Sequence, residues 1–148
     1  LSTLFRATLN NQTSLIPLKD EIELCHRYLN IEGLRLGDRL NIDWQIDLAH
    51  QRVNIPPLTL QPLFENAIYH GIQPRTEGGT ITVKTDVSSD TLYILISNPY
   101  DDNLEKHQGN HVALENIQSR LKAIFGERAV LKTSQLDGIF TATLRLPI

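Results

Sequence analysis

Two hairpin signals constrain the fold of this 148-residue chain more than any other feature. Asp137-Gly138 separates two alternating segments, and this dipeptide strongly favours a two-residue turn between antiparallel strands. Ser88–Asp90 separates another such pair in the same way. Alternation of apolar and polar residues predicts five strands in total, at residues 40–46, 80–87, 92–97, 129–134 and 139–146.

Helical periodicity fills most of the sequence between these strands. Apolar residues recur every three or four positions in four segments, at residues 1–10, 17–33, 56–71 and 112–125. Proline suits the first turn of a helix, so Pro17 and Pro56-Pro57 mark two starts, whereas Gly33 and Gly126 mark two ends. We therefore predict an α+β fold, a two-layer α/β sandwich in which helices cover a mixed, mostly antiparallel sheet.

Composition excludes several classes of protein. A formal net charge of −3 argues against binding nucleic acid through bulk positive charge. The single cysteine, Cys25, excludes an internal disulfide framework and a multi-cysteine zinc site. No apolar run approaches the roughly 20 residues that span a bilayer. The chain starts at Leu1 and contains no Met, so we expect it to be a piece of a longer protein.

The sequence does not decide the structural role of two segments. In the predicted helix 17–33, Leu18, Ile22, Cys25 and Leu29 form a narrow apolar seam. That seam either covers the core of the domain or joins the domain to an upstream helical hairpin. The polar stretch 98–110 is long for a connection without secondary structure, and such loops are usually functional or mobile.

The polar edge of the helix predicted at residues 56–71 carries the most informative chemistry. Glu65 and Asn66 are neighbours at this edge, and His70 follows one turn after Asn66. An amide oxygen suits Mg²⁺, a carboxylate can orient or deprotonate an attacking group, and an imidazole can contact phosphate oxygens. The alternative is an ordinary solvated edge of an amphipathic helix.

Four segments give the chain a resemblance to a known family. Pro62-Leu63-Phe64-Glu65-Asn66-Ala67-Ile68-Tyr69-His70-Gly71 resembles the N box of sensor histidine kinases of the LytS/AlgZ type, whose usual form reads P-L-V-E-N-A-I-K-H-G. The segment 18–40 is similar to their link between the phosphoacceptor helices and the ATP lobe. Downstream, Ala113-Leu114-Glu115-Asn116-Ile117 with Arg120-Leu121 resembles their G-L-x-N-I-x-x-R-L helix, and 142–147 resembles the end of the family's domain. The match covers almost the whole chain in the right order.

The resemblance implies a Bergerat (GHKL-type) fold that binds ATP and Mg²⁺ between the N-box helix and a lid. It implies that Glu65 is the catalytic residue that helps activate an acceptor histidine and that Asn66 is the Mg²⁺ ligand. The lid is implied to be the loop 98–110. The implied nucleotide-binding residues are Asn66, His70, Asn98, Gly109, His111, Ala113, Leu114 and Asn116.

The resemblance also implies the biological role. Residues 1–36 would be a helical linking segment that follows a phosphoacceptor H box outside this sequence, and residues 37–148 would be the GHKL-type ATP-binding catalytic domain. The function implied is transfer of the ATP γ-phosphoryl group to a histidine on an upstream dimerisation helix of the same or the paired protomer. A response regulator, of the LytTR type by resemblance, would then receive the phosphoryl group.

Further implications concern the setting of the domain. The parent protein would be a homodimeric inner-membrane sensor kinase with this domain in the cytoplasm and no direct contact with nucleic acid. Without its H box, the fragment alone would be inactive as a kinase.

The sequence departs from the family pattern at two boxes that contact nucleotide. Asn98 stands where the family's D-N-G box has its aspartate, and Tyr100 replaces the glycine of that box. In the second glycine box, only Gly109 remains of G-x-G-x-G. These departures keep an alternative open, in which the domain has weak or no ATP turnover and instead binds the response regulator or couples the subunits of a dimer.

Overall fold

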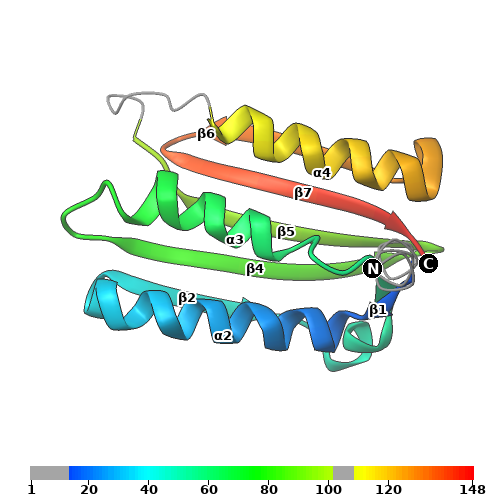
Figure 1. Ribbon diagram of the computed structural model, residues 1–148, viewed down its shortest axis with the longest axis horizontal. Coiled ribbons are helices and arrows are strands. Elements are labelled where there is room, and N and C mark those ends of the chain that lie inside the picture. The colour runs from blue at the N-terminus through cyan, green and yellow to red at the C-terminus, as the bar shows by residue number, and fades with distance from the viewer. Residues whose placement is uncertain (1–13, 102–108) are drawn as a thin grey trace, which may run out of the picture.

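The computed structural model describes residues 14–101 and 109–148, and it places three helices against one face of a five-stranded sheet (Figure 1). The helix predicted at residues 1–10 and the middle of the predicted lid, residues 102–108, lie outside the described residues. The helices are α2 (Leu18–Leu36), α3 (Gln61–Ala67) and α4 (Gly109–Phe125). The two-layer fold predicted from the sequence is confirmed.

The sheet has the order β2-β4-β5-β7-β6. Its strands are β2 (Leu40–Gln45), β4 (Gly79–Ser88), β5 (Thr91–Pro99), β6 (Val130–Leu136) and β7 (Ile139–Pro147). Both predicted hairpins are confirmed: Ser88 pairs with Thr91, and Leu136 pairs with Ile139. The pair β2–β4 is parallel and the other neighbours are antiparallel, so the sheet is mixed and mostly antiparallel.

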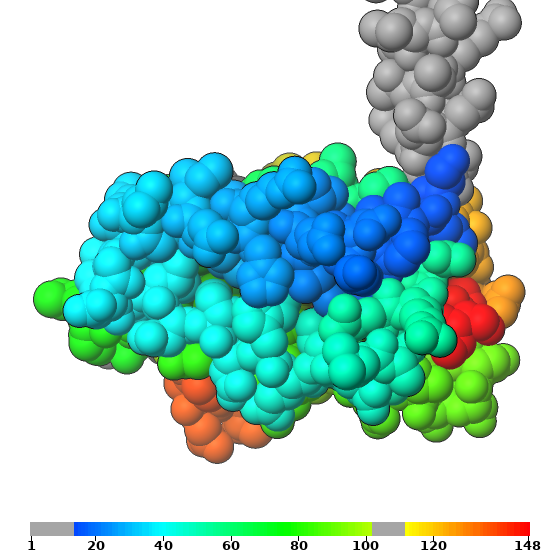
Figure 2. Space-filling model, turned by 90° about the horizontal axis from the view of Figure 1, so that it is seen from below, coloured from blue at the N-terminus to red at the C-terminus, as the bar shows by residue number. Residues whose placement is uncertain are grey.

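Short elements complete the connections. The 3₁₀ turns are η1 (Gly37–Arg39), η2 (Leu48–Arg52) and η4 (Gly126–Arg128), and a small antiparallel pair joins β1 (Ile16–Pro17) to β3 (Asn54–Ile55). Figure 2 shows α2 running along one side of the molecule, with the segment that follows it packed beneath. None of the helices in the described part of the chain has the length and apolarity needed to cross a bilayer.

The apolar core lies between the helices and the sheet. From β4, β5 and β7, alternate residues such as Ile81, Ile94 and Leu144 face the helices and are buried. From α2, the predicted seam is buried as a whole, since Leu18, Ile22, Cys25 and Leu29 are all core residues. The structure therefore shows that α2 covers the core, which was one of the two roles left open by its sequence.

Several element boundaries differ from the sequence predictions. The helix predicted to end at Gly33 continues to Leu36 and ends at Gly37, whose φ of 58° breaks the helix. The next helix begins at Gln61 and not at the prolines 56–57, because Leu58 has a φ of 58° that no right-handed helix contains. The loop predicted at 98–110 is shorter at both ends, since Asn98 and Pro99 belong to β5 and Gly109 begins α4.

Candidate functional site

A pocket of about 690 Å³ lies between α2, the α3 region and the beginning of α4. Three of the residues predicted to act in catalysis and binding, Glu65, Asn66 and His70, line it together with Ala113 of α4. The structure thus brings four of the predicted site residues around one cavity. The residues that line the pocket are Tyr28, Glu32, Arg35, Pro62, Glu65, Asn66, Ile68, Tyr69, His70, Gln73 and Ala113.

The α3 helix positions its polar residues by burying its opposite face. Leu63, Phe64 and Ala67 are core residues of α3, so the side chains of Glu65 and Asn66 emerge on either side of the buried stripe. Glu65 is exposed and accepts a hydrogen bond from Gln61 Nε2 to its Oε1 at 3.2 Å. Asn66 is 8% exposed, so its amide is held in a nearly buried position at the pocket wall.

A π-helical turn, η3 (Ile68–Ile72), continues directly from α3 and carries the rest of the motif. The wider turn is closed by the backbone N–H of Gln73, which donates to the carbonyl of Ile68 at 2.8 Å. π-Turns inside helices occur frequently at functional sites. Here the turn sets the direction of Tyr69 and His70, whose rings meet edge to face with centroids 4.9 Å apart.

Two charged side chains fix the two ends of the α3 region. At the beginning, the fully buried carboxylate of Glu21 accepts hydrogen bonds from the backbone N–H of Leu58 (3.0 Å) and Leu60 (2.8 Å). At the end, Arg39 Nη2 donates to the carbonyls of Gln73 (2.7 Å) and Arg75 (2.8 Å), which no longer have helical partners. Both anchors come from α2 or from the turn after it, so this part of the chain positions the motif.

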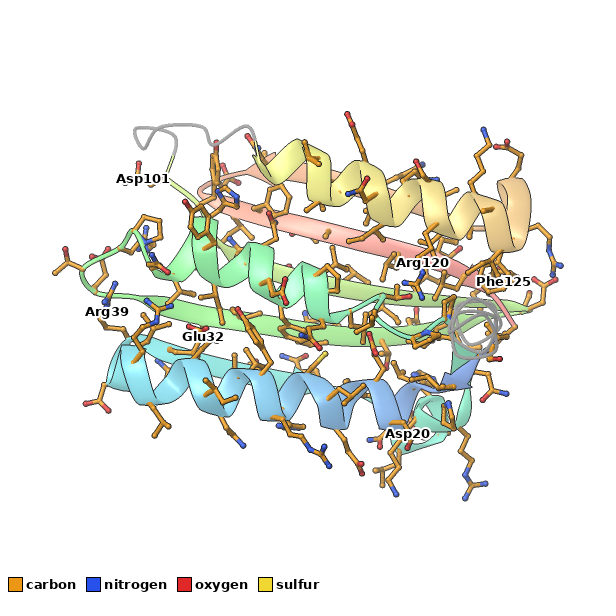
Figure 3. All side chains as sticks on the ribbon, in the orientation of Figure 1. Asp20, Glu32, Arg39, Asp101, Arg120 and Phe125 are labelled. Atoms are coloured by element: carbon orange, nitrogen blue, oxygen red, sulfur yellow. The ribbon has the colours of Figure 1, made fainter. Side chains whose placement is uncertain are left out.

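Arg120 of α4 holds the same preceding segment from the opposite side. Its guanidinium donates to the carbonyls of Pro57 and Leu58, the latter at 3.0 Å. Figure 3 shows Arg120 directed from α4 toward the chain before α3. The beginning of α3 is therefore tied to both neighbouring helices.

Asn98 lies beneath this region, near the end of β5. It is 3% exposed, and its Nδ2 donates to the carbonyl of Pro99 at 2.8 Å. A Cβ on Gly71 would lie 2.3 Å from Nδ2 of Asn98, so only glycine allows this close approach between η3 and β5. Asn98 does not line the pocket described above but adjoins its helical wall from the sheet side.

The remaining predicted binding residues belong to α4. Gly109 and His111 fall by their backbone in its first turn. Leu114 is partly buried and packs against the core, and Asn116 is exposed, so neither lines the pocket. Of the members whose side chains the structure describes, Ala113 lines the pocket.

The contribution of α2 to the pocket was not predicted from the sequence. Tyr28, Glu32 and Arg35 line it from the side opposite to α3, and Figure 3 shows Glu32 directed from α2 toward α3. Their spacing of four and three residues places them on one face of a helix. That spacing was visible in the sequence, but which partner the face meets depends on tertiary structure.

The pocket is acidic, and its charges alter nearby ionisable groups. Burial, with the carboxylates of Glu32 and Glu65, raises the pKa of Tyr28 to about 12, although Arg35 opposes this. Burial likewise raises the pKa of the Cys25 thiol, with smaller contributions from Glu21 and Glu65. At neutral pH both groups are therefore uncharged, and the buried thiol is a poor nucleophile.

The chain is similar in sequence to several known proteins. A family model described as "Histidine kinase" matches residues 1–40. The sensor protein LytS of Oceanobacillus iheyensis is 32% identical over 152 residues, a match that covers 93% of this chain and 26% of that protein. The sensor histidine kinase BtsS of Escherichia coli K12 is 30% identical over 152 residues, with 99% of this chain and 26% of that protein covered. The chain belongs to the LytS-type sensor histidine kinases.

Solved structures show the same fold at much lower identity. The catalytic domain of the histidine kinase ThkA superposes with a TM-score of 0.68 at 12% identity, and covers 90% of this chain and 96% of that domain. The Acinetobacter baumannii histidine kinase AdeS gives a TM-score of 0.67 at 12% identity, with 90% of this chain and 66% of that chain covered. The fold is therefore that of a histidine kinase catalytic domain. The chain spans about a quarter of the length of the curated relatives it matches.

Proposed function

We propose that this chain is the ATP-binding catalytic part of a two-component sensor kinase. It would transfer the γ-phosphoryl group of ATP to a histidine on an upstream dimerisation helix, from which a response regulator, of the LytTR type by resemblance, receives it. The observation that carries this proposal is the meeting of Glu65, Asn66 and His70 with the first turns of α4 around one pocket of about 690 Å³. The volume lies within the range of small-molecule sites, and the family membership supports a kinase role.

Asn66 is the proposed ligand for Mg²⁺. Its amide is held at the pocket wall, and Mg²⁺ commonly takes one or two protein oxygens while substrate phosphates and water complete its shell. Among the described residues, no cluster of three His, Cys, Asp or Glu side chains is arranged to hold a metal. A single amide oxygen suits a cation that arrives with its nucleotide, and the ion would supply charge neutralisation at the phosphates.

Glu65 is proposed to act on the acceptor histidine. In the transfer, a bond forms between the γ-phosphorus and one ring nitrogen of the histidine, and the bond from that phosphorus to the bridging oxygen breaks to release ADP. The exposed carboxylate of Glu65 is accessible to an incoming side chain and would accept the hydrogen bond, and finally the proton, of the other ring nitrogen.

The remaining residues are assigned roles by their positions. His70 and the first turn of α4, with Gly109, His111 and Ala113, would contact the phosphates, since the N-terminus of a helix favours anions. Asn98 would contact the adenine through its amide group from the sheet side. Leu114 and Asn116 would support this helix near the nucleotide. Residues 102–108, which lie outside the described residues, would belong to the lid.

The organisation of the chain follows from the same proposal. Residues 1–36 would link the catalytic part to the phosphoacceptor helices, and 37–148 would form the ATP-binding part. Because α2 supplies core residues and pocket residues, it would serve as connection and as wall of the site. The parent protein would be a dimeric membrane sensor with this domain in the cytoplasm.

Labelled ATP tests the proposed reaction. A protein that carries this chain behind its own phosphoacceptor helices should incorporate label from the γ-position into an acid-labile, base-stable phosphohistidine, whereas the 148-residue chain alone should not. Glu65→Gln should lower the rate by about 100-fold, as expected for the loss of a general base. Glu23→Gln removes a carboxylate from the exposed side of α2 and serves as the matched control. Equal labelling of wild type and Glu65→Gln would contradict the role of Glu65.

A second function is supported by the departures in the nucleotide boxes. Asn98 in place of an aspartate and the single Gly109 favour a module with weak or no ATP turnover, which would bind the response regulator or couple dimer subunits. Regulator binding that is unaffected by nucleotide and by Glu65→Ala, together with no detectable Mg-ATP binding to the folded chain, would favour this function over the kinase.

A further inference from the structure

Arg35 brings a permanent positive charge to the described lining of the pocket. Of the described residues that line it, Glu32 and Glu65 are acidic and Arg35 alone carries a charge that does not depend on pH. Mg-ATP keeps a net negative charge, so a site with two carboxylates repels it unless a cation offsets them. Within the described lining of the pocket, Arg35 is therefore the side chain that can offer the phosphates a permanent positive charge.

Arg35 is placed to supply that charge. Its Nη2 donates to Glu32 Oε2 at 2.5 Å and to Gln73 Oε1 at 3.1 Å. The first contact fixes the guanidinium relative to α2, and the second joins it to the residue that closes the π-turn. Arg35 is thus held across the gap between α2 and the end of the N-box helix.

The guanidinium retains donors for a ligand. Among the described residues, both of its hydrogen bonds leave from Nη2, which leaves the N–H groups of Nε and Nη1 available. The side chain is 52% exposed, whereas that of its anchor Glu32 is 19% exposed. The carboxylate of Glu32, which orients the guanidinium of Arg35, is mostly buried, whereas the guanidinium remains accessible. This arrangement forms a preorganised site for phosphate oxygens.

We propose that Arg35 is a phosphate-binding residue of the nucleotide site, with Glu32 and Gln73 as its positioning residues. This inference rests on the proposed function, because it assumes that the pocket takes Mg-ATP. It makes α2 part of the substrate-binding surface. Movement of α2 relative to α3 would then change the affinity for the phosphates directly.

Nucleotide titrations of the 148-residue chain test the role of Arg35. Calorimetry with Mg-ATP and NMR titration with adenosine separate the phosphate contribution from the adenine contribution. Arg35→Ala should weaken Mg-ATP binding about tenfold, as expected for loss of a charge-assisted hydrogen bond, and should change adenosine binding less than about twofold. Arg35→Lys keeps the positive charge but loses the planar N–H donors of the guanidinium, so it should weaken Mg-ATP binding about threefold.

Two controls make the outcomes distinct. Arg27→Ala removes the same charge from the exposed face of α2, outside the pocket, and should leave both ligands unaffected. Asn66→Ala should abolish Mg-ATP binding. If Asn66→Ala abolishes binding while Arg35→Ala behaves like Arg27→Ala, the role of Arg35 is overturned and the proposed function stands. If the folded wild-type chain binds no Mg-ATP, both are overturned.

A structural effect is recognised by the adenosine titration. Equal losses for adenosine and Mg-ATP in Arg35→Ala would overturn the phosphate-specific role. Should Arg35→Ala fail to fold, Arg35→Gln keeps a polar side chain beside Glu32 and Gln73, and it is expected to show the same loss of about tenfold for Mg-ATP alone.

Discussion

At the scale of single residues, the structure depends on a few charged groups that satisfy backbone atoms. Glu21 is fully buried and has no basic partner among the ion pairs of the described residues, yet its two hydrogen bonds serve the N–H groups of Leu58 and Leu60. A buried carboxylate is tolerated when donors compensate its lost hydration. In the sequence, Glu21 is visible only as an acidic residue near the beginning of the predicted helix 17–33.

Glu21→Gln should destabilise the fold by about 2–3 kcal/mol, because an amide accepts with one oxygen and presents its NH₂ to a backbone donor. Glu23→Gln, two positions away and exposed, should change the free energy of unfolding by less than about 0.5 kcal/mol. Urea unfolding of both variants measures the difference. Equal stability of the two variants would show that Glu21 does not carry the segment before α3.

Tyr28 should make the stability of the fold depend on pH. Its pKa is raised from 10.0 to about 12 in the folded chain, so the folded state keeps its proton where the unfolded state loses it. The contribution of Tyr28 to stability is therefore complete below about pH 10 and is lost as the pH rises toward 12. The difference in unfolding free energy between wild type and Tyr28→Phe should be constant up to about pH 10 and should fall above it. A difference that stays flat to pH 12 would contradict the burial of this hydroxyl group.

At the scale of elements, local signals predicted most of the fold. Asp137-Gly138 and Ser88–Asp90 specify their turns because the required left-handed backbone occurs at Ser89, Asp137 and Gly138. The parallel pairing of β2 with β4 has no such local signal, since it depends on how α3 crosses between them. The left-handed conformation of Leu58 was equally hidden, because nothing in an apolar residue between prolines and Thr59 indicates it.

Two helical glycines should respond in opposite ways to alanine. At Gly33 in α2, the position that an alanine methyl group would take has no other atom within 4 Å, so Gly33→Ala should stabilise the fold by about 0.5–1 kcal/mol through helix propensity. At Gly71 the methyl group would collide with the buried side chain of Asn98, so Gly71→Ala should destabilise the fold by about 1–3 kcal/mol. Thermal unfolding of both variants gives the signs. A stabilising Gly71→Ala would mean that η3 and β5 are further apart than the structure has them.

At the scale of the whole molecule, the candidate site combines one contiguous motif with residues far away in the sequence. The N-box residues Glu65, Asn66 and His70 were found from the sequence because they lie within six consecutive residues of one motif. The wall formed by Tyr28, Glu32 and Arg35 was not found, because it depends on how α2 packs against α3. The pocket is therefore formed by the packing of three helices, and ligand binding should stabilise all three.

If the proposed function is correct, nucleotide binding to this pocket should raise the stability of the whole domain. A ligand that binds only the folded state stabilises it in proportion to the logarithm of its concentration, by about 2.7 kcal/mol at about one hundred times its dissociation constant. For a domain of this size such a gain should raise the melting temperature by about 5–10 °C. Mg-ATP should produce this shift, and EDTA should remove most of it if binding requires Mg²⁺ at the proposed ligand Asn66. Asn66→Ala should show no shift with Mg-ATP, while Arg27→Ala should shift as wild type does. A shift of the same size with ATP in EDTA would contradict the proposed role of Mg²⁺, and a full shift in Asn66→Ala would contradict the proposed role of Asn66.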